Sequence, residues 1–334
     1  MSENSNVQGS FGEYSEGEKM ENLIFSLNAT IPIFLLMVLG VFFRRVGLIK
    51  GELIGGLNQF VFKAALPVLL FGNLAVEDFT SVWDTRFVVF CFGTTLLSIT
   101  IVYLISLTLK DSSIRGEFVQ GSYRSSAAIL GIAFIKNIYG TSGMAPLMIV
   151  GSVPLYNVMA VVVLSFMRPG QSGMSDPTLL KKTLRGIATN PIILGIFFGA
   201  LWSVLKIPMP AIMLKTVNTL GGMATPLGLM AMGAGFDWKQ AKRGMGSAFL
   251  GSFMKLFGLC AIFLPVAVFF GFREAKLIAI LVMLGSSTTV SSYVMARNMG
   301  HAGVLTSSIV ALTTCGSAFS LTFWLYLLKT LELI

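Results

Sequence analysis

The sequence predicts an all-α integral membrane protein with ten transmembrane helices, arranged as a 5+5 inverted repeat. Three observations lead to this fold class. Of the 334 residues, 54% are hydrophobic and only 12% are charged, and the mean hydropathy is +0.81, which reverses the balance of a soluble domain. Apolar stretches of roughly 20 residues, long enough to cross a hydrocarbon core as a helix, recur along the chain. The two halves also share a spacing of Pro and Asp residues.

The charge and the polar residues exclude several other classes. The net charge is +9, but Lys and Arg occur singly or in pairs between apolar segments, so we expect no nucleic-acid binding. Cys91, Cys260 and Cys315 are odd in number and far apart in apolar segments, which predicts buried thiols and neither a disulfide framework nor a metal site. His301 is predicted in a solvated loop. We therefore expect no cofactor and no enzymatic activity.

The apolar segments divide the chain into four parts. Residues 1–21 are rich in Ser, Glu, Gly and Asn, which predicts a disordered N-terminal tail. A connection at 167–185 that contains Pro and Gly is predicted as a cytoplasmic linker between a first five-helix repeat, 22–166, and a second, 186–334. The ten segments lie at approximately 22–43, 55–76, 87–109, 118–139, 144–166, 186–205, 211–233, 246–270, 276–297 and 303–328.

The spacing of Pro and Asp indicates an internal repeat. Pro67 and Asp78, in and after the second segment, correspond to Pro226 and Asp237, in and after the seventh, and both pairs are displaced by 159 positions. Since five helices are an odd number, the second copy must cross the membrane in the opposite sense. Inverted repeats of this kind are typical of secondary transporters.

The distribution of Lys and Arg predicts the orientation in the membrane. Thirteen of them lie at the helix ends on the side of Arg44, the 167–185 linker and residues 239–243, and eight lie on the other side. The side with more Lys and Arg is expected to be cytoplasmic. We therefore expect a multi-pass protein of the plasma or inner membrane with both termini on the extracytoplasmic side.

The fourth and ninth segments are unusually polar for helices in lipid. Small polar residues fall near mid-span in both, where a hydroxyl needs a partner or a cavity. Matched anomalies in the two halves predict broken helices four and nine that cross near the bilayer midplane, with helix ends suited to binding an anion. Close packing of small residues is the alternative interpretation. The candidate substrate-binding residues here are Ser125, Ser126, Ser286, Ser287, Thr288 and Thr289.

Three basic residues lie inside apolar segments and complete the candidate site. They are Lys63, Arg124 and Lys255, and each costs at least about 2.5 kcal/mol at a helix centre, which marks it as a functional candidate. Arg124 is also close enough to the cytoplasmic side to extend its side chain to the surface. No carboxylate is expected at mid-span, since Glu117 and Glu274 precede the broken helices. This pattern favours an anionic substrate.

Several short motifs, in order, resemble the auxin efflux carrier family, which includes plant auxin exporters and bacterial permeases. The resemblance spans roughly residues 22–330. The residues that carry it are Gly131-Ile132 and Ile135–Gly140 in the fourth segment, Tyr293–Arg297 in the ninth, Val153–Asn157 in the fifth, Asn190-Pro191 at the start of the sixth, and Pro67 and Pro226.

The resemblance implies a scaffold formed by segments one, two, six and seven. It also implies a moving unit formed by segments three to five and eight to ten, in an elevator-type transporter. We therefore predict secondary active transport of a small organic anion, such as a mono- or dicarboxylate, across the lipid bilayer. Proton coupling, sodium coupling and a homodimer are each compatible with this. The alternatives are a sodium-coupled bile-acid-type carrier, a channel and a membrane sensor.

Overall fold

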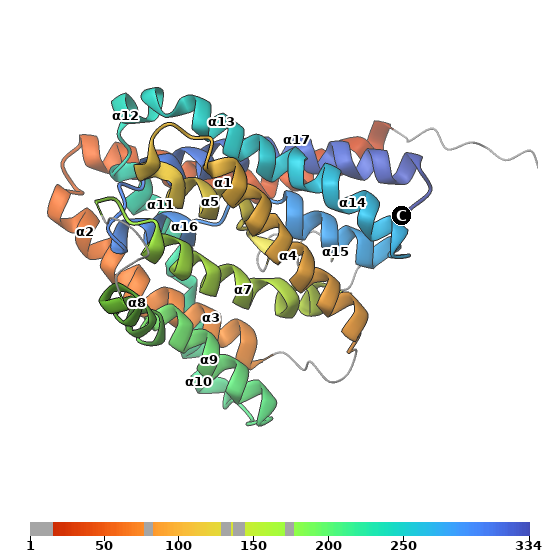
Figure 1. Ribbon diagram of the computed structural model, residues 1–334, viewed down its shortest axis with the longest axis horizontal. Coiled ribbons are helices and arrows are strands. Elements are labelled where there is room, and N and C mark those ends of the chain that lie inside the picture. The colour runs from red at the N-terminus through yellow and green to blue at the C-terminus, as the bar shows by residue number, and fades with distance from the viewer. Residues whose placement is uncertain (1–15, 77–82, 128–134, 136–143, 171–176) are drawn as a thin grey trace, which may run out of the picture.

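A computed structural model describes residues 16–76, 83–127, 135, 144–170 and 177–334 (Figure 1). Within these ranges the chain is helical and contains no strand. The helices are, in chain order, α1 (Glu16–Arg45), α2 (Gly51–Phe60), η1 (Val61–Ala65), α3 (Leu66–Ala75), α4 (Thr85–Ser106), η2 (Ser112–Ile114), α5 (Arg115–Tyr123), α7 (Ala145–Phe166), α8 (Pro177–Ala188), α9 (Pro191–Val204), α10 (Ala211–Gly222), α11 (Ala224–Ala234), α12 (Trp238–Arg243), α13 (Met245–Phe253), η4 (Met254–Gly258), α14 (Leu259–Phe269), α15 (Glu274–Gly285), α16 (Ser291–Asn298) and α17 (Val304–Thr330).

Several of these helices have the length and composition needed to cross a membrane. By those two criteria, five runs qualify among the described residues: Gly51–Ala75, Thr85–Ser106, Ala145–Phe166, Met245–Phe269 and Val304–Thr330. The other predicted segments also fall on helices, except that most of the fourth beyond residue 127 lies outside the described residues. The structure is therefore all-α with several membrane-length helices, whereas the exact ten-helix inverted repeat stays a prediction.

Two helices overlap the segments that were predicted as a tail and a linker. Helix α1 begins at Glu16, so residues 16–21 continue a helix where a disordered tail was expected. The predicted linker 167–185 also overlaps a helix, α8, with a strongly basic sequence from Lys181 to Arg185.

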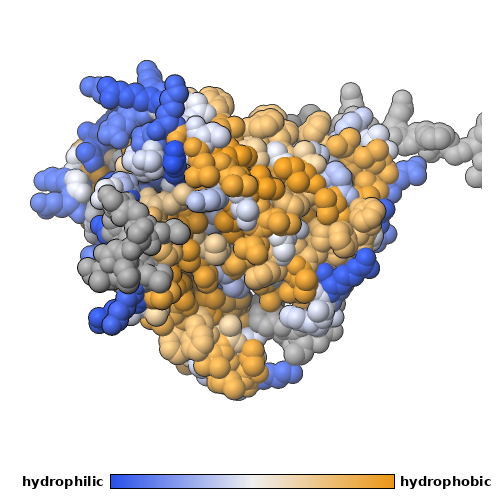
Figure 2. All heavy atoms as spheres, in the orientation of Figure 1, coloured by the Kyte–Doolittle hydropathy of each residue, from blue (hydrophilic) through white to orange (hydrophobic). Residues whose placement is uncertain are grey.

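The surface is mostly apolar between two polar ends. Figure 2 shows a broad apolar face, with hydrophilic residues gathered mainly at the end where α2 and α12 lie in Figure 1. The start of α1 and the end of α17 lie together at the opposite end. Many large apolar side chains are exposed, among them Leu97, Phe197 and Phe269. This is the surface expected where lipid is the solvent.

The helices pack as two groups. The first helix group comprises α1, α2, α3, α9, α10 and α11, in which α3 packs on α9 and α10, and α1 packs on α11. The second helix group comprises α4, α5, α7 and α13 to α17, in which α4 packs on α5 and α7, and α13 packs on α17. Contacts between α1 and α17, and between α16 and both α2 and α11, join the groups. Each group draws helices from both halves of the chain.

Glycines allow close helix approach in the first helix group. A Cβ added at Gly195 of α9 would lie 2.4 Å from the main-chain oxygen of Pro67 on α3, and one at Gly199 would lie 2.8 Å from that of Phe71. Both contacts are with backbone, which cannot move aside as a flexible side chain can. Small residues spaced four apart are a common way for membrane helices to pack closely.

We predict that Gly195→Leu destabilises the protein. The new side chain must push α9 away from α3, and overpacking of this kind costs about 1–3 kcal/mol. The measurement is the melting temperature of purified protein in detergent, with Gly55→Leu as the control because a Cβ at Gly55 of α2 meets no atom within 4 Å. Equal melting temperatures for the two variants would contradict close α3–α9 packing.

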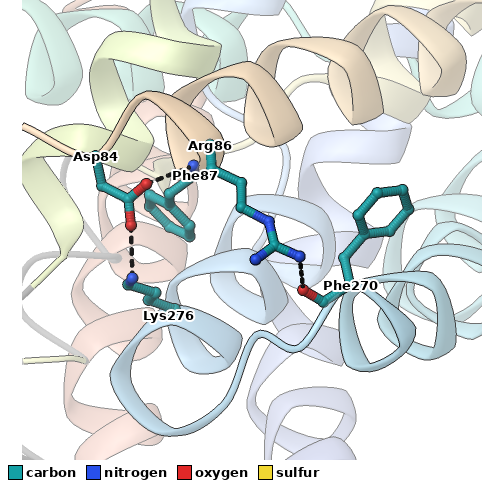
Figure 3. A network of polar contacts seen from close by, with 5 residues as sticks. All are labelled: Asp84, Arg86, Phe87, Phe270 and Lys276. Carbon is teal, nitrogen blue, oxygen red and sulfur yellow. Dashed lines mark hydrogen bonds and ion pairs between the residues drawn. The ribbon is translucent and has the colours of Figure 1, made fainter.

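A polar network fastens the start of α4 to α14 and α15 (Figure 3). Asp84 caps α4 by accepting a hydrogen bond from the Phe87 amide at 3.0 Å, and it forms an ion pair with Lys276 of α15 at 2.5 Å. Arg86 donates to the main-chain oxygen of Phe270 at 2.6 Å. The hydrogen bond from Lys276 and, to a smaller extent, the one from the Phe87 amide hold the pKa of the Asp84 carboxyl below its usual value.

This depressed pKa predicts a stability contribution that disappears in acid. Because the folded state holds the Asp84 proton more weakly than the unfolded state, the contribution is present at neutral pH and is lost as the pH falls below about 4. The pair is partly exposed, so we expect only about 0.2–1 kcal/mol. Asp84→Asn should therefore lower the melting temperature at pH 7, and by progressively less as the pH falls through the depressed pKa of Asp84. A Lys276→Met variant should behave alike, and additive losses in the double variant would argue against the pair.

Candidate functional site

Two helices end deep in the second helix group, and the non-helical segments that follow them, residues 124–126 and 286–290, are the two interruptions. Helix α5 ends at Tyr123, and Arg124 is extended (φ −68°, ψ 140°). Helix α15 ends at Gly285, Ser286 is extended (φ −72°, ψ 160°), and α16 begins at Ser291. The sequences at both interruptions are rich in Ser and Thr, whose hydroxyls compete for backbone hydrogen bonds and so favour helix ends.

The two interruptions contact each other directly. The Ser126 amide donates to the Ser287 oxygen at 2.9 Å, and the hydroxyls of Ser125 and Ser286 are hydrogen-bonded. The Thr288 hydroxyl donates to the oxygen of Gly121, near the end of α5, at 2.7 Å. A helix end leaves main-chain carbonyls without helical partners, and lipid has no donor for them. The Thr288 hydroxyl supplies a donor for one such carbonyl, that of Gly121.

The carboxyl end of α15 receives donors from three other elements. The Val282 oxygen accepts from Ser125 at 3.2 Å, and the Met283 oxygen accepts from the Tyr156 hydroxyl of α7 at 3.0 Å. The Leu284 oxygen accepts from the Lys255 ammonium of η4, which also lies 3.5 Å from the Met283 oxygen. The last turn of α15 is therefore held by hydroxyls and a cation.

Arg124 is the centre of a buried polar cluster. Its side chain is only 1% exposed, so it does not extend to the surface as the alternative interpretation held. One guanidinium nitrogen donates to Asn157 Oδ1 at 2.7 Å and Ser291 Oγ at 2.8 Å, and another to Gln120 Oε1 at 3.4 Å. These partners are neutral, and Nε has no partner among the described residues. None of the described Asp and Glu residues forms an ion pair with Arg124.

A small cavity adjoins the guanidinium and lies between the two helix groups. It has about 60 Å³ of free volume, which is room for a few water molecules. One wall comes from η1, α3 and the start of α11, and the other from residues 124–126, α7 and residues 289–294. Its polar lining residues are Asn73, Arg124, Ser125, Ser126, Tyr156, Asn157, Thr225, Thr289 and Ser291.

The predicted site residues therefore fall into three sets. Arg124, Ser125, Ser126 and Thr289 line the cavity. Ser286, Ser287 and Thr288 are buried where the interruptions meet. Lys255 is fully buried against the end of α15, and Lys63 is exposed on η1; neither lines the cavity.

Sequence reasoning missed the residues that hold Arg124 in place. Asn157 lies in an apolar helix, α7, where an amide is as unusual as a charge, and this signal could have identified it. Ser291 lies among the small polar residues of the ninth predicted segment but was not predicted to bind substrate. Gln120 lies one helical turn before Arg124 and also donates to the Ser292 oxygen at 2.8 Å.

Three sequence predictions about single residues were wrong. Glu117 lies inside α5 and is buried, because its carboxylate accepts hydrogen bonds from the amides of Gly303 at 2.8 Å and Thr306 at 2.9 Å at the start of α17. His301 is buried, not solvated, with Nε2 2.9 Å from the Leu164 oxygen. Cys315 is exposed on α17, whereas Cys91 and Cys260 are buried as predicted.

Comparison with known proteins establishes the family. The profile of the family described as "Membrane transport protein" matches residues 25–325, which is most of the chain. The chain belongs to this family. The resemblance to the auxin efflux carriers, which the sequence motifs indicated, is thereby confirmed. The protein is a membrane transporter, and with several apolar helices it crosses the membrane more than once.

Two relatives extend this comparison. A protein of Rhizobium meliloti named "Putative malonate transporter" is 24% identical over 215 residues, which are 64% of this chain and 67% of that protein. A protein of Methanothermobacter thermautotrophicus named "Uncharacterized transporter" is 21% identical over 304 residues, or 90% of this chain and 97% of that protein. Both names indicate transport rather than catalysis.

Proposed function

We propose that this transporter is a secondary carrier that moves a small organic anion, a mono- or dicarboxylate, by elevator-type alternating access. The observation that carries the proposal is the Arg124 guanidinium, which is buried at a cavity without a carboxylate partner among the described residues. A buried charge that has only neutral partners and no opposite charge beside it is unfavourable. A substrate carboxylate in the cavity would neutralise it.

The other cavity residues support an anion. Ser126 and Thr289 offer hydroxyl donors, and residues 289–291 stand at the start of α16, where a helix carries partial positive charge. Lys63 and Lys255, which do not line the cavity, have no contact role in this site. The malonate in the name of the R. meliloti relative is a small dicarboxylate, which agrees with the positive charge of Arg124 at this cavity.

The position of the cavity supports the elevator mechanism. One wall belongs to the first helix group and the other to the second, so movement of one group past the other would carry a bound ligand across the membrane. We assign the first group as the scaffold and the second, which contains both interruptions, as the moving unit. In the proposed orientation, both termini lie on the extracytoplasmic side of the cell membrane.

Uptake of labelled malonate into liposomes containing the purified protein tests this function. We expect uptake that saturates with concentration and is inhibited by other small carboxylates, because each cycle binds a ligand. Protein-free liposomes are the control. Flux that rises linearly with concentration would indicate a channel, and malonate binding without any flux would indicate a sensor. Uptake that requires sodium would favour the bile-acid-type carrier.

A further inference from the structure

Lys255 lies against the carboxyl end of helix α15. The residue is fully buried in the π-helical turn η4, and its ammonium donates to the Leu284 oxygen and lies 3.5 Å from the Met283 oxygen. Both oxygens belong to the last turn of α15. No described carboxylate forms an ion pair with the ammonium, so main-chain oxygens are its charge partners.

The end of an interrupted helix is a natural cation site. The aligned peptide dipoles give a helix a partial negative charge at its carboxyl end, and the last carbonyls lack helical partners. In secondary transporters with broken helices, such carbonyls coordinate the coupling ion. The ammonium of Lys255 can do what such an ion does, because its positive charge faces the negative end of the helix and its three N–H groups can donate to the free carbonyls.

We propose that Lys255 is a tethered cation, whose ammonium takes the place at the end of α15 that a free monovalent cation would otherwise fill. Transport then requires no sodium or potassium. This consequence rests on the proposed transport function, whereas the cation site itself does not. Lys255 is a positioning residue, because it does not line the cavity itself but binds the last turn of α15. The Val282 oxygen of that turn accepts a hydrogen bond from Ser125, which does line the cavity.

Removing the side chain should open the site to free cations. We expect Lys255→Ala to reduce malonate uptake in choline medium by at least about tenfold, the lower range for loss of a hydrogen bond to a charged group. Sodium or methylammonium should restore much of this uptake, because either ion can enter the vacated space. Wild-type uptake should be equal in choline and sodium media. Lys63→Ala, which removes an exposed lysine from the π-helical turn η1, is the matched control and should show no cation response.

A binding measurement separates this inference from the proposed function. The melting temperature of purified Lys255→Ala should rise with sodium or methylammonium relative to choline, and that of the wild type should not. This result needs no substrate, so it stands even if malonate is not transported. A folded Lys255→Ala variant that responds to no small cation would overturn the proposal, as would sodium-dependent uptake by the wild type.

A second variant covers the case in which Lys255→Ala does not fold. Lys255→Gln retains a neutral donor for the same carbonyls but lacks the charge. If the charge matters, this variant should fold and still lose uptake by at least about tenfold. If Lys255→Gln takes up malonate in choline medium as fast as the wild type does, any hydrogen-bond donor suffices at this position. The tethered-cation proposal would then be rejected.

Discussion

Replacing Arg124 with Met should weaken malonate binding by about ten- to a hundredfold, the range that follows from about 1.5–3 kcal/mol for a hydrogen bond to a charged group. Methionine retains the apolar part of the side chain and removes the charge that faces the cavity. Transport at low malonate concentration should fall by the same factor. Affinity is best measured by calorimetry or by the malonate-dependent rise in melting temperature.

The stability of the same variant distinguishes a binding role from a structural one. A buried guanidinium with only neutral partners is a poor source of stability, so we expect Arg124→Met without malonate to melt near the wild-type temperature. Arg124→Lys is the matched control. It retains the charge but cannot hold Asn157 and Ser291 with one planar group, so its affinity should be intermediate. Unchanged affinity together with lost stability in Arg124→Met would remove Arg124 from the site.

Enlarging Ser126 to Leu should abolish malonate transport while leaving the protein folded. Ser126 is half-buried and lines a cavity of only about 60 Å³, so a leucine side chain would fill the space that the substrate needs. The hydrogen bond from Ser126 to Ser287 uses the main-chain amide and survives the substitution. The measurements are uptake into liposomes and the melting temperature with and without malonate. Ser126→Ala is the control, and it should keep most of the uptake.

Ser287→Leu provides a contrast at the adjoining interruption. Ser287 is 2% exposed and does not line the cavity, so the larger side chain has no free space. Overpacking should reduce the free energy of unfolding by about 1–3 kcal/mol. The yield of folded protein and the melting temperature should therefore both fall. If Ser126→Leu instead unfolds the protein and Ser287→Leu only blocks transport, the assignment of the cavity is wrong.

The sequence by itself determined the class of protein and the region of the site. Composition and apolar segments of membrane length identify lipid as the solvent, since water-soluble chains cannot expose that much apolar surface. The polar runs in the fourth and ninth segments marked the places where α5 and α15 end. Arg124 was a candidate because a charge in an apolar segment is costly unless it has a function.

Only the tertiary structure decided what each embedded charge does. Lys63, Arg124 and Lys255 look alike in the sequence, yet one is exposed, one lines a cavity and one binds helix carbonyls. The reason is that lipid-facing and protein-facing positions of a membrane helix are both apolar, so hydropathy does not reveal which face packs on which neighbour. Asn157 and Ser291, two of the partners of Arg124, lie 33 and 167 positions from it in the sequence. They come within reach only when α7 and α16 pack against α5.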